Sequence, residues 1–128
     1  MTGASALLAC YEGQSHDIVL QCIASYLAVK GWKVYNLGQN TPTKSLVGAI
    51  KRYKPTIVVL AALLVENERK FVRDVNQTIL RPAHRVGAKL VIGGAKMKTK
   101  FGGRLKADVV SESMRDVEGV IISHRKHL

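Results

Sequence analysis

Residues 56–63 form an uninterrupted apolar run after a proline, reading Thr-Ile-Val-Val-Leu-Ala-Ala-Leu. Successive side chains of a strand point to opposite faces of its sheet, so this segment would be apolar on both faces. Strands of that kind lie inside parallel sheets, where helices cover both sides. The run therefore restricts the chain to folds in which a buried strand is flanked by helices.

The rest of the chain supplies such helices in alternation with further short strands. Apolar side chains recur every three or four positions from residue 16 to residue 30, which predicts a helix that Gly31 closes. Thr43 is expected to be the N-cap of the next helix, and Pro82 is expected to break the third one. We predict strands at 5–10, 33–37, 56–63, 89–92 and 109–110, and helices at 16–30, 43–53, 66–80, 101–105 and 114–124. This alternation predicts an α/β fold with a doubly wound parallel five-stranded sheet.

The composition is that of a globular chain. With 128 residues and 47% hydrophobic residues, we expect one packed domain over residues 1–128. No apolar run approaches the roughly 20 residues that cross a bilayer, and no secretory signal is recognisable, so we expect a cytoplasmic protein without membrane contact. Cys10 and Cys22 are expected to be buried, reduced thiols rather than a disulfide.

The formal net charge of +11 favours anionic partners such as nucleic acid, a phosphorylated ligand or an acidic protein. The basic residues are spread along the chain, with clusters at 96–106 and 124–127. Neither a recognition helix nor a zinc knuckle can be identified. A solvated basic face is therefore the preferred interpretation, with DNA or an acidic protein as a candidate partner.

The loop after the first predicted strand carries His16, at the point where a helix begins. In open α/β sheets the carboxyl ends of the strands form the ligand-binding edge. The loops at 38–42, 61–63 and 93–94 should converge on this edge, and their small residues would let a planar or elongated ligand lie against the backbone. One histidine without further ligands at metal spacing does not make a zinc site. A single axial ligand does suit a macrocycle such as a corrin or a porphyrin.

These residues resemble the cobalamin-binding domains of the flavodoxin-like type. The segment from Gly31 through Leu37 and Gly38 to Pro42 is similar to the family's second strand and loop. The likeness covers nearly the whole chain and is closest to the regulatory modules of MerR-type light-responsive repressors. The family's Asp-x-His-x-x-Gly corresponds to Gln14, Ser15, His16, Asp17, Ile18 and Val19, its Ser-x-Leu to Ala61, Ala62 and Leu63, and its Gly-Gly to Gly93 and Gly94.

The resemblance implies that His16 binds cobalt in place of the cofactor's own nucleotide base. The displaced nucleotide tail would run between the first helix and the sheet, with the loops at Ala61 and at residues 93–94 as walls. Gln14 stands where the family has an aspartate as acceptor for the imidazole N–H, and Glu12 or Asp17 could take that role. Haem is the alternative macrocycle, and a domain without any cofactor is the third option.

Three departures from the motif bear on function. Val19 replaces a glycine that makes room beside the cofactor, Gln14 is a weaker partner than a carboxylate, and Ala61 lacks a hydroxyl for the tail. A cobalamin-carrying small subunit of a mutase or corrinoid methyltransferase would be expected to keep the aspartate and the glycine. The sequence therefore favours a cofactor-sensing regulatory module without catalysis by the isolated chain, and it leaves homo-oligomerisation open.

Without the resemblance, these residues have simpler interpretations. A histidine that opens a helix is more often a capping or surface residue than a ligand, and a Gly-Gly pair can be a turn that binds nothing. Trp32 is expected to pack at a helix–strand junction, and His84, His124 and His127 to be solvated. Ser15 beside His16 lacks a third orienting group, which argues against hydrolase chemistry. A cofactor-free module that binds nucleic acid through its basic face stays an alternative.

Overall fold

A computed structural model of the chain describes residues 3–13, 18–62, 65–95, 97–112 and 119–120, with the side chain of Val19 left aside. Five strands form one sheet in the order β2-β1-β3-β4-β5, and each neighbouring pair is parallel. The predicted doubly wound parallel five-stranded sheet is therefore confirmed. The strands are β1 (Ser5–Cys10), β2 (Lys33–Asn36), β3 (Ile57–Ala61), β4 (Lys89–Gly93) and β5 (Val109–Ser111).

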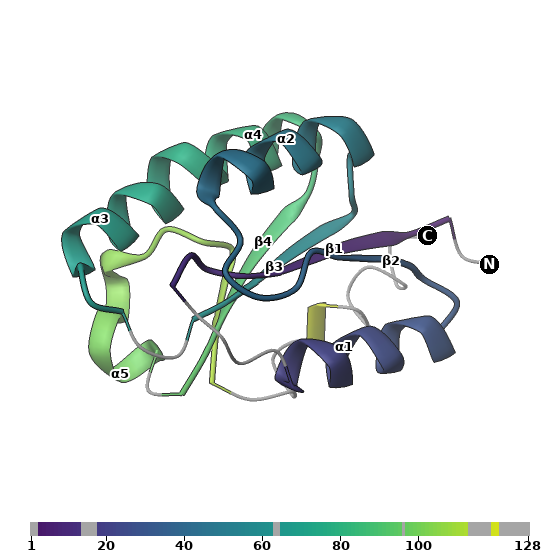
Figure 1. Ribbon diagram of the computed structural model, residues 1–128, viewed down its shortest axis with the longest axis horizontal. Helices are drawn as coiled ribbons and strands as arrows, with labels where there is room; N and C mark the ends of the chain where they lie inside the picture. Colours follow the sequence, from purple (N-terminus) through teal and green to yellow (C-terminus); the bar gives the residue numbers. More distant parts are fainter. Residues whose placement is uncertain (1–2, 14–17, 63–64, 96, 113–118, 121–128) are drawn as a thin grey trace.

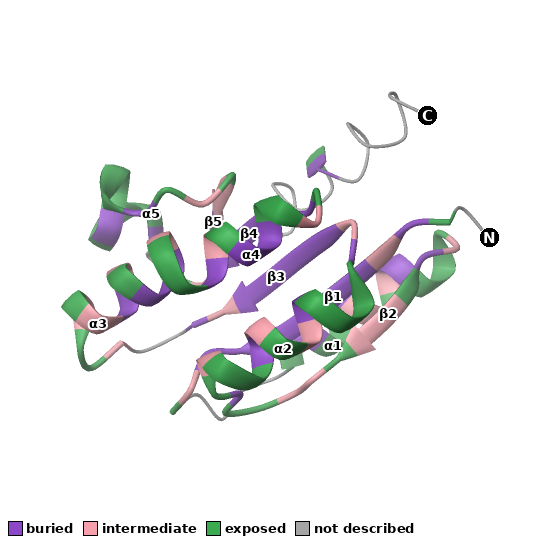
Figure 2. Ribbon diagram, turned by 90° about the horizontal axis from the view of Figure 1, so that it is seen from above, coloured by how far each residue is buried: buried purple, intermediate pink, exposed green. Residues whose placement is uncertain are grey.

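Strand β3 is the central strand, as its apolar run predicts. Ile57, Val58, Val59 and Leu60 are at most 1% exposed, and Figure 2 shows the strand buried along most of its length. The observed strand ends at Ala61 and is shorter than the predicted segment 56–63, whose last residue, Leu63, lies outside the described residues.

Helices cover both faces of the sheet (Figure 1). α1 (Ile18–Val29) lies on one face, where Leu20, Ile23 and Leu27 pack with Leu8, Val59 and Val91. The opposite face carries the larger core, which includes Leu46, Ile50, Phe71, Val75 and Ile79. Its covering elements are α2 (Thr43–Tyr53), α3 (Glu68–Arg73), the π-helical segment η1 (Asp74–Ile79), α4 (Leu80–Arg85) and α5 (Met97–Phe101), which η2 (Gly102–Arg104) follows.

The spacing of apolar residues predicts that α1 buries Ile18, Val19, Cys22, Ile23, Tyr26, Leu27 and Val29. The structure confirms this face for Ile23 and Leu27. Leu20, Ile23 and Leu27 are at most 3% exposed, whereas Ile18 is 69% and Val29 86% exposed. Cys22 is also exposed, so the prediction that both thiols are buried is wrong for Cys22 and correct for Cys10; neither forms a disulfide. The cause is that α1 is apolar on nearly every side, so its spacing alone does not identify the face that docks on the sheet.

The third helix also continues further than predicted. Pro82 does not break it, since α4 runs from Leu80 to Arg85 and the ring of Pro82 is buried. The π-helical turn immediately before gives an i→i+5 pattern, as in the bond from Leu80 N–H to the Val75 carbonyl. This wider turn makes room for a proline that would clash with the carbonyl four residues earlier in a regular α-helix.

The junction after α1 agrees with expectation, whereas the start of α2 differs from it. Gly31 closes α1 with a φ of 87°, and Trp32 beside it is 4% exposed, as predicted for a packing residue. Thr43 is the first residue of α2, but Pro42 occupies the cap position and no side chain caps that end. The predicted last helix at 114–124 lies outside the described residues except for residues 119–120. Among the described residues, no helix is long and apolar enough to span a membrane.

Candidate functional site

The loops that follow the strands are joined to one another at the carboxyl edge of the sheet. Cys10 N–H donates to the Gly38 carbonyl at 2.9 Å, and Tyr11 N–H donates to the Ala61 carbonyl at 2.8 Å. Further along, Ala62 N–H donates to the Gly93 carbonyl at 2.9 Å, and Gly94 N–H to the Ser111 carbonyl at 3.1 Å. The predicted convergence of these loops is therefore observed for Gly38, Ala61, Gly93 and Gly94, and the expected site residues Leu37 and Pro42 lie on either side of Gly38 in the chain.

A row of small residues crosses the last position of four strands. Cys10, Ala61, Gly93 and Ser111 are register partners in β1, β3, β4 and β5. Residues two positions apart in a strand point to the same face of the sheet. Two positions earlier, these strands carry Leu8, Val59, Val91 and Val109, which belong to the hydrophobic core beneath α1. The row of Cys10, Ala61, Gly93 and Ser111, which we name the small row, therefore lies on the α1 face of the sheet. It lies at the carboxyl edge, beyond the larger side chains of the core.

The two glycines after β4 have different roles. A Cβ built on Gly94 would lie 1.9 Å from the Ala62 carbonyl oxygen, so this residue must be glycine for the loops to approach each other. A Cβ on Gly93 would meet nothing within 4 Å. Gly94 thus fits the simpler interpretation of a tight turn, whereas Gly93 leaves open space in the small row.

The loop between β2 and α2 is fixed to the end of β1. Gly38 has a φ of 79°, and its carbonyl accepts the bond from Cys10. Thr41 N–H donates to the Cys10 carbonyl at 2.9 Å, and the Asn40 side chain accepts from Gly13 N–H at 2.7 Å. The two loops thus hold each other just before the segment that contains Gln14, Ser15, His16 and Asp17. That segment lies outside the described residues, as do Leu63 and the side chain of Val19.

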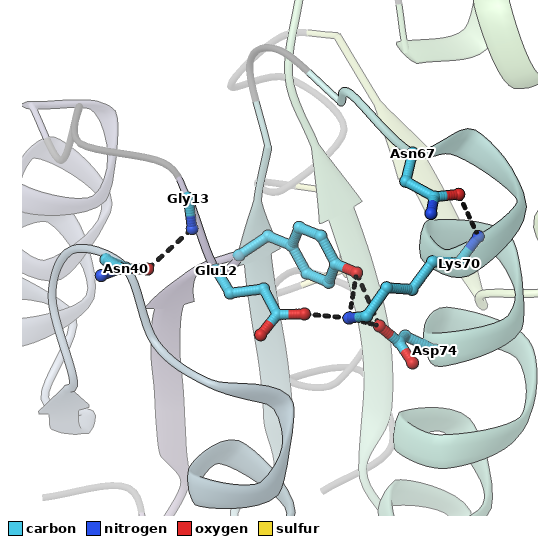
Figure 3. A network of polar contacts seen from close by, with 7 residues as sticks. Glu12, Gly13, Asn40, Asn67, Lys70 and Asp74 are labelled. Atoms are coloured by element: carbon cyan, nitrogen blue, oxygen red, sulfur yellow. Dashed lines mark hydrogen bonds and ion pairs between the residues drawn. The ribbon is translucent and has the colours of Figure 1, made fainter.

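The sequence did not predict a polar network on the opposite side of the same edge (Figure 3). The Tyr11 hydroxyl donates to Asp74 Oδ2 at 2.6 Å, and the carboxylate of Asp74 also accepts from Lys70 Nζ at 2.9 Å. Lys70 Nζ contacts Glu12 as well, and it lies 3.4 Å from the Tyr11 hydroxyl. Tyr11 and Asp74 are buried, whereas Lys70 and Glu12 are partly exposed, and together they tie the exit of β1 to the start of η1.

The surroundings shift the acidity of two members of the network. Burial and the neighbouring Asp74 carboxylate raise the pKa of Tyr11 to about 12. Hydrogen bonds to Glu12 and then to Asp74 raise the pKa of Lys70 above its ordinary value. Both groups therefore keep their protons at neutral pH, and the network acts as a fixed support rather than a proton donor. The sequence signal was the Lys70–Asp74 spacing of four residues on a helix, opposite a tyrosine that ends a strand.

His84 lies away from this edge, near the amino-terminal end of β4. Its Nε2 lies 2.9 Å from Asp108 Oδ2, and the same carboxylate oxygen accepts from Leu90 N–H at 2.8 Å. The prediction that His84 is merely solvated is therefore incomplete, because its side chain is half exposed and also paired. His124 and His127 lie outside the described residues. Among those described, no three His, Cys, Asp or Glu side chains gather where they could hold a metal ion.

Comparison with known proteins shows which family this chain resembles. Residues 4–117 match the B12 binding domain. Trimethylamine corrinoid protein 1 of Methanosarcina mazei is 30% identical over 106 residues, which cover 83% of this chain and 49% of that protein. The HTH-type transcriptional repressor CarA of Myxococcus xanthus is 34% identical over 94 residues, which cover 72% of this chain and 31% of the repressor. The chain thus spans about half the length, or less, of these relatives.

Solved structures show the same fold. A cobalamin-binding protein from Desulfitobacterium hafniense has a TM-score of 0.74 at 29% identity, over 95% of this chain and 58% of that one. The monomethylamine corrinoid protein of Methanosarcina barkeri has a TM-score of 0.77 at 20% identity, over 94% and 57% of the two chains. None of these relatives is described as a haem protein, so the comparisons give no support to the haem alternative. The chain belongs to the B12-binding domain family.

Proposed function

We propose that this chain binds cobalamin at the carboxyl edge of its sheet, with His16 as the axial ligand of cobalt. The observation that carries the proposal is the row formed by Cys10, Ala61, Gly93 and Ser111, together with the open space beside Gly93. In a sheet of this topology, ligands bind at the strand ends where the strand order reverses, which here is between β1 and β3. The small row begins at those two strands.

The described residues fit the nucleotide tail of a corrinoid. Small side chains on four neighbouring strands let an elongated group lie close to the backbone, beneath the first turns of α1. Larger residues such as Leu8 and Val59 would end that space two positions deeper. When bound, cobalamin would supply a cobalt ion in a corrin ring, which one imidazole can ligate. His16 follows three residues after Gly13, whose N–H the Asn40 side chain holds at 2.7 Å, so its loop starts from a fixed point.

We further propose that the bound cofactor serves sensing rather than catalysis. Gln14 and Val19 replace the aspartate and glycine that a carrier subunit would be expected to keep. The repressor CarA is a relative at 34% identity, which supports a regulatory use of this domain. The second candidate is a corrinoid carrier for a methyltransferase. Its support is the similarity to trimethylamine corrinoid proteins over 83% of this chain.

The test is a spectroscopic titration of the purified chain in the dark with hydroxo-, methyl- and adenosylcobalamin. We expect tight binding and a base-off spectrum in which histidine is the axial ligand. His16→Ala should lose that spectrum, while His84→Ala, which removes a histidine at the other end of the sheet, should keep it. Unshifted spectra with all three cobalamins would refute the proposal, and haemin in the same series tests the other macrocycle.

The two uses of the cofactor can be separated in the same samples. A sensor should change its oligomeric state when its adenosylcobalamin complex is illuminated, which size-exclusion chromatography detects. A carrier should instead accept methylcobalamin, keep its size in the light, and co-purify with a methyltransferase subunit.

A further inference from the structure

The outer surface of α2 and of the rod formed by α3, η1 and α4 is mainly basic, and its accessible carboxylates, Glu66 and Glu68, lie just before and at the start of α3. Both elements cover the same face of the sheet (Figure 1), and α2 packs against η1 and α4. α2 and α4 contain no acidic residue. Within the rod, Glu68 lies 3.8 Å from Arg104 and Asp74 is bonded to Tyr11 and Lys70. The exposed cations of this surface, which we name the basic layer, are Lys44, Lys51, Arg52, Arg69, Arg73, Arg81 and Arg85.

The four arginines of the rod lie along one line. They occupy positions 69, 73, 81 and 85, with Gln77 completing a four-residue repeat, and all five are exposed. The buried side chains Phe71, Val75, Ile79 and Ala83 follow the same repeat two residues out of step. In a regular α-helix a four-residue step overshoots a turn by about 40°, so both lines would wind around the rod. The π-helical segment turns less per residue and compensates for that drift, which keeps the arginines opposite the core.

Three of the four arginines in this line have no acidic residue one helical turn away along the rod. Arg69 and Arg73 form a like-charge pair four residues apart, as do Arg81 and Arg85, and such pairs destabilise a helix. No acidic residue stands three or four positions from Arg73, Arg81 or Arg85. Surface helices usually alternate the two signs of charge. A polyanion laid along the rod would relieve this repulsion, and arginine is well suited to phosphate because it can donate two parallel hydrogen bonds.

We propose that the basic layer binds the phosphate backbone of duplex DNA. The arginine line runs over 16 residue steps, about 24 Å, which matches roughly seven base pairs. Tyr53, the aromatic side chain of α2, is already stacked on Tyr35 with ring centroids 4.1 Å apart, which favours contacts with a phosphate backbone over stacking of a single-stranded base. A B-form major groove admits a helix between its phosphate walls, whereas the deep, narrow groove of duplex RNA does not. The proposed DNA binding is independent of cofactor binding, because the basic layer and the small row lie on opposite faces of the sheet.

The test compares two charge-matched triple variants of the full chain. Arg73→Gln/Arg81→Gln/Arg85→Gln removes three charges from the layer, and Lys30→Gln/Lys98→Gln/Lys100→Gln removes three exposed charges outside it, just after α1 and on α5. Fluorescence anisotropy with a duplex of about 20 base pairs, between about 50 and 200 mM salt, gives the affinity and its salt dependence. We expect the arginine triple to weaken binding about 10-fold or more and to lower the salt slope by about 3, because each lost phosphate contact removes close to one unit.

The matched lysine triple should stay within about threefold of the parent protein, since distant charges are largely screened. Arg73→Lys/Arg81→Lys/Arg85→Lys should keep most of the salt slope, and circular dichroism confirms that each variant is folded. Equal losses in both glutamine triples would overturn the proposal in favour of a general charge effect. Absence of binding at low salt would also overturn it, as would competition by polyglutamate as effective as that by duplex DNA.

Discussion

Replacing Gly94 with alanine is expected to destabilise the fold strongly, although the change adds a single methyl group. A Cβ at this position lies 1.9 Å from the Ala62 carbonyl oxygen and 3.2 Å from Met97 Cε. The methionine methyl can move aside, but the carbonyl belongs to the backbone that follows β3. Ala62 is fixed from its other side, because its N–H donates to Gly93 at 2.9 Å.

The size of this destabilisation follows from the distance between the added Cβ and the Ala62 carbonyl oxygen. A carbon and a carbonyl oxygen in close contact are about 3.3 Å apart, so the two loops must separate by about 1.4 Å. Overpacking of a rigid site costs about 1–3 kcal/mol, and loss of the bond from Gly94 N–H to Ser111 would add about 1 kcal/mol. We therefore expect about 3 kcal/mol of destabilisation and a fall in Tm of roughly 10 °C for a chain of this size.

Gly93→Ala is the matched control. Its Cβ meets nothing within 4 Å and its φ is not positive, so the free energy of unfolding should change by less than about 0.5 kcal/mol. If the open space beside Gly93 receives the cofactor, this variant should lose cobalamin affinity while keeping its stability. Urea denaturation and the cobalamin titration measure the two properties separately. A Gly94→Ala protein that melts within about 2 °C of the parent would refute the reasoning.

Three further outcomes follow from the described contacts. Tyr11→Phe removes a buried hydroxyl that donates to Asp74 at 2.6 Å, so urea denaturation should show a loss of about 1.5–3 kcal/mol, against about 0.5 kcal/mol or less for Tyr53→Phe at the surface. Ellman's reagent should label Cys22 rapidly in the native protein and Cys10 only after unfolding, because the former is exposed and the latter buried; equal rates would contradict this structure. Desolvation alone would raise the pKa of Asp108, but hydrogen bonds from Leu90 N–H and His84 lower it below its ordinary value of 3.8. The carboxylate therefore stabilises the fold above that pH and loses its contribution as the pH falls further, so Asp108→Asn should flatten the acid limb of the stability curve.

The sheet could be predicted because local and tertiary demands agree along the strands. The predicted strand at 5–10 has the same bounds in the structure. The central strand can be recognised from the sequence because it is apolar on both faces. Parallel strands with helical connections then leave few topologies, and the glycine-rich loops of a parallel sheet must meet at one edge. The convergence of Gly38, Ala61 and Gly93 follows from these constraints without knowledge of any side-chain contact.

Three features of the helices could not be predicted, because the sequence permits alternatives of similar stability and tertiary contacts decide between them. The apolar surface of α1 offers more than one face, and only docking on Leu8 and Val59 selects Leu20, Ile23 and Leu27. The path through Pro82 depends on a π-helical turn, which has no reliable sequence signature. Lys70 and Asp74 look like ordinary polar residues of a surface helix. They join a partly buried network with Tyr11 only because the rod places them opposite the end of β1.

That network narrows the choice of partner for the His16 imidazole. Glu12 was one of two carboxylates that could replace the family's aspartate, but its carboxylate is engaged by Lys70 on the α3 side of the edge. The ammonium of Lys70 also serves Asp74 and lies near the Tyr11 hydroxyl, so withdrawing Glu12 would leave the cation with fewer acceptors in a site that raises its pKa. A ligating imidazole needs an acceptor that is free to turn toward it. We therefore infer that Gln14 or Asp17, next to His16 in the sequence, is the better candidate for that role, and that Glu12 instead anchors the start of the loop.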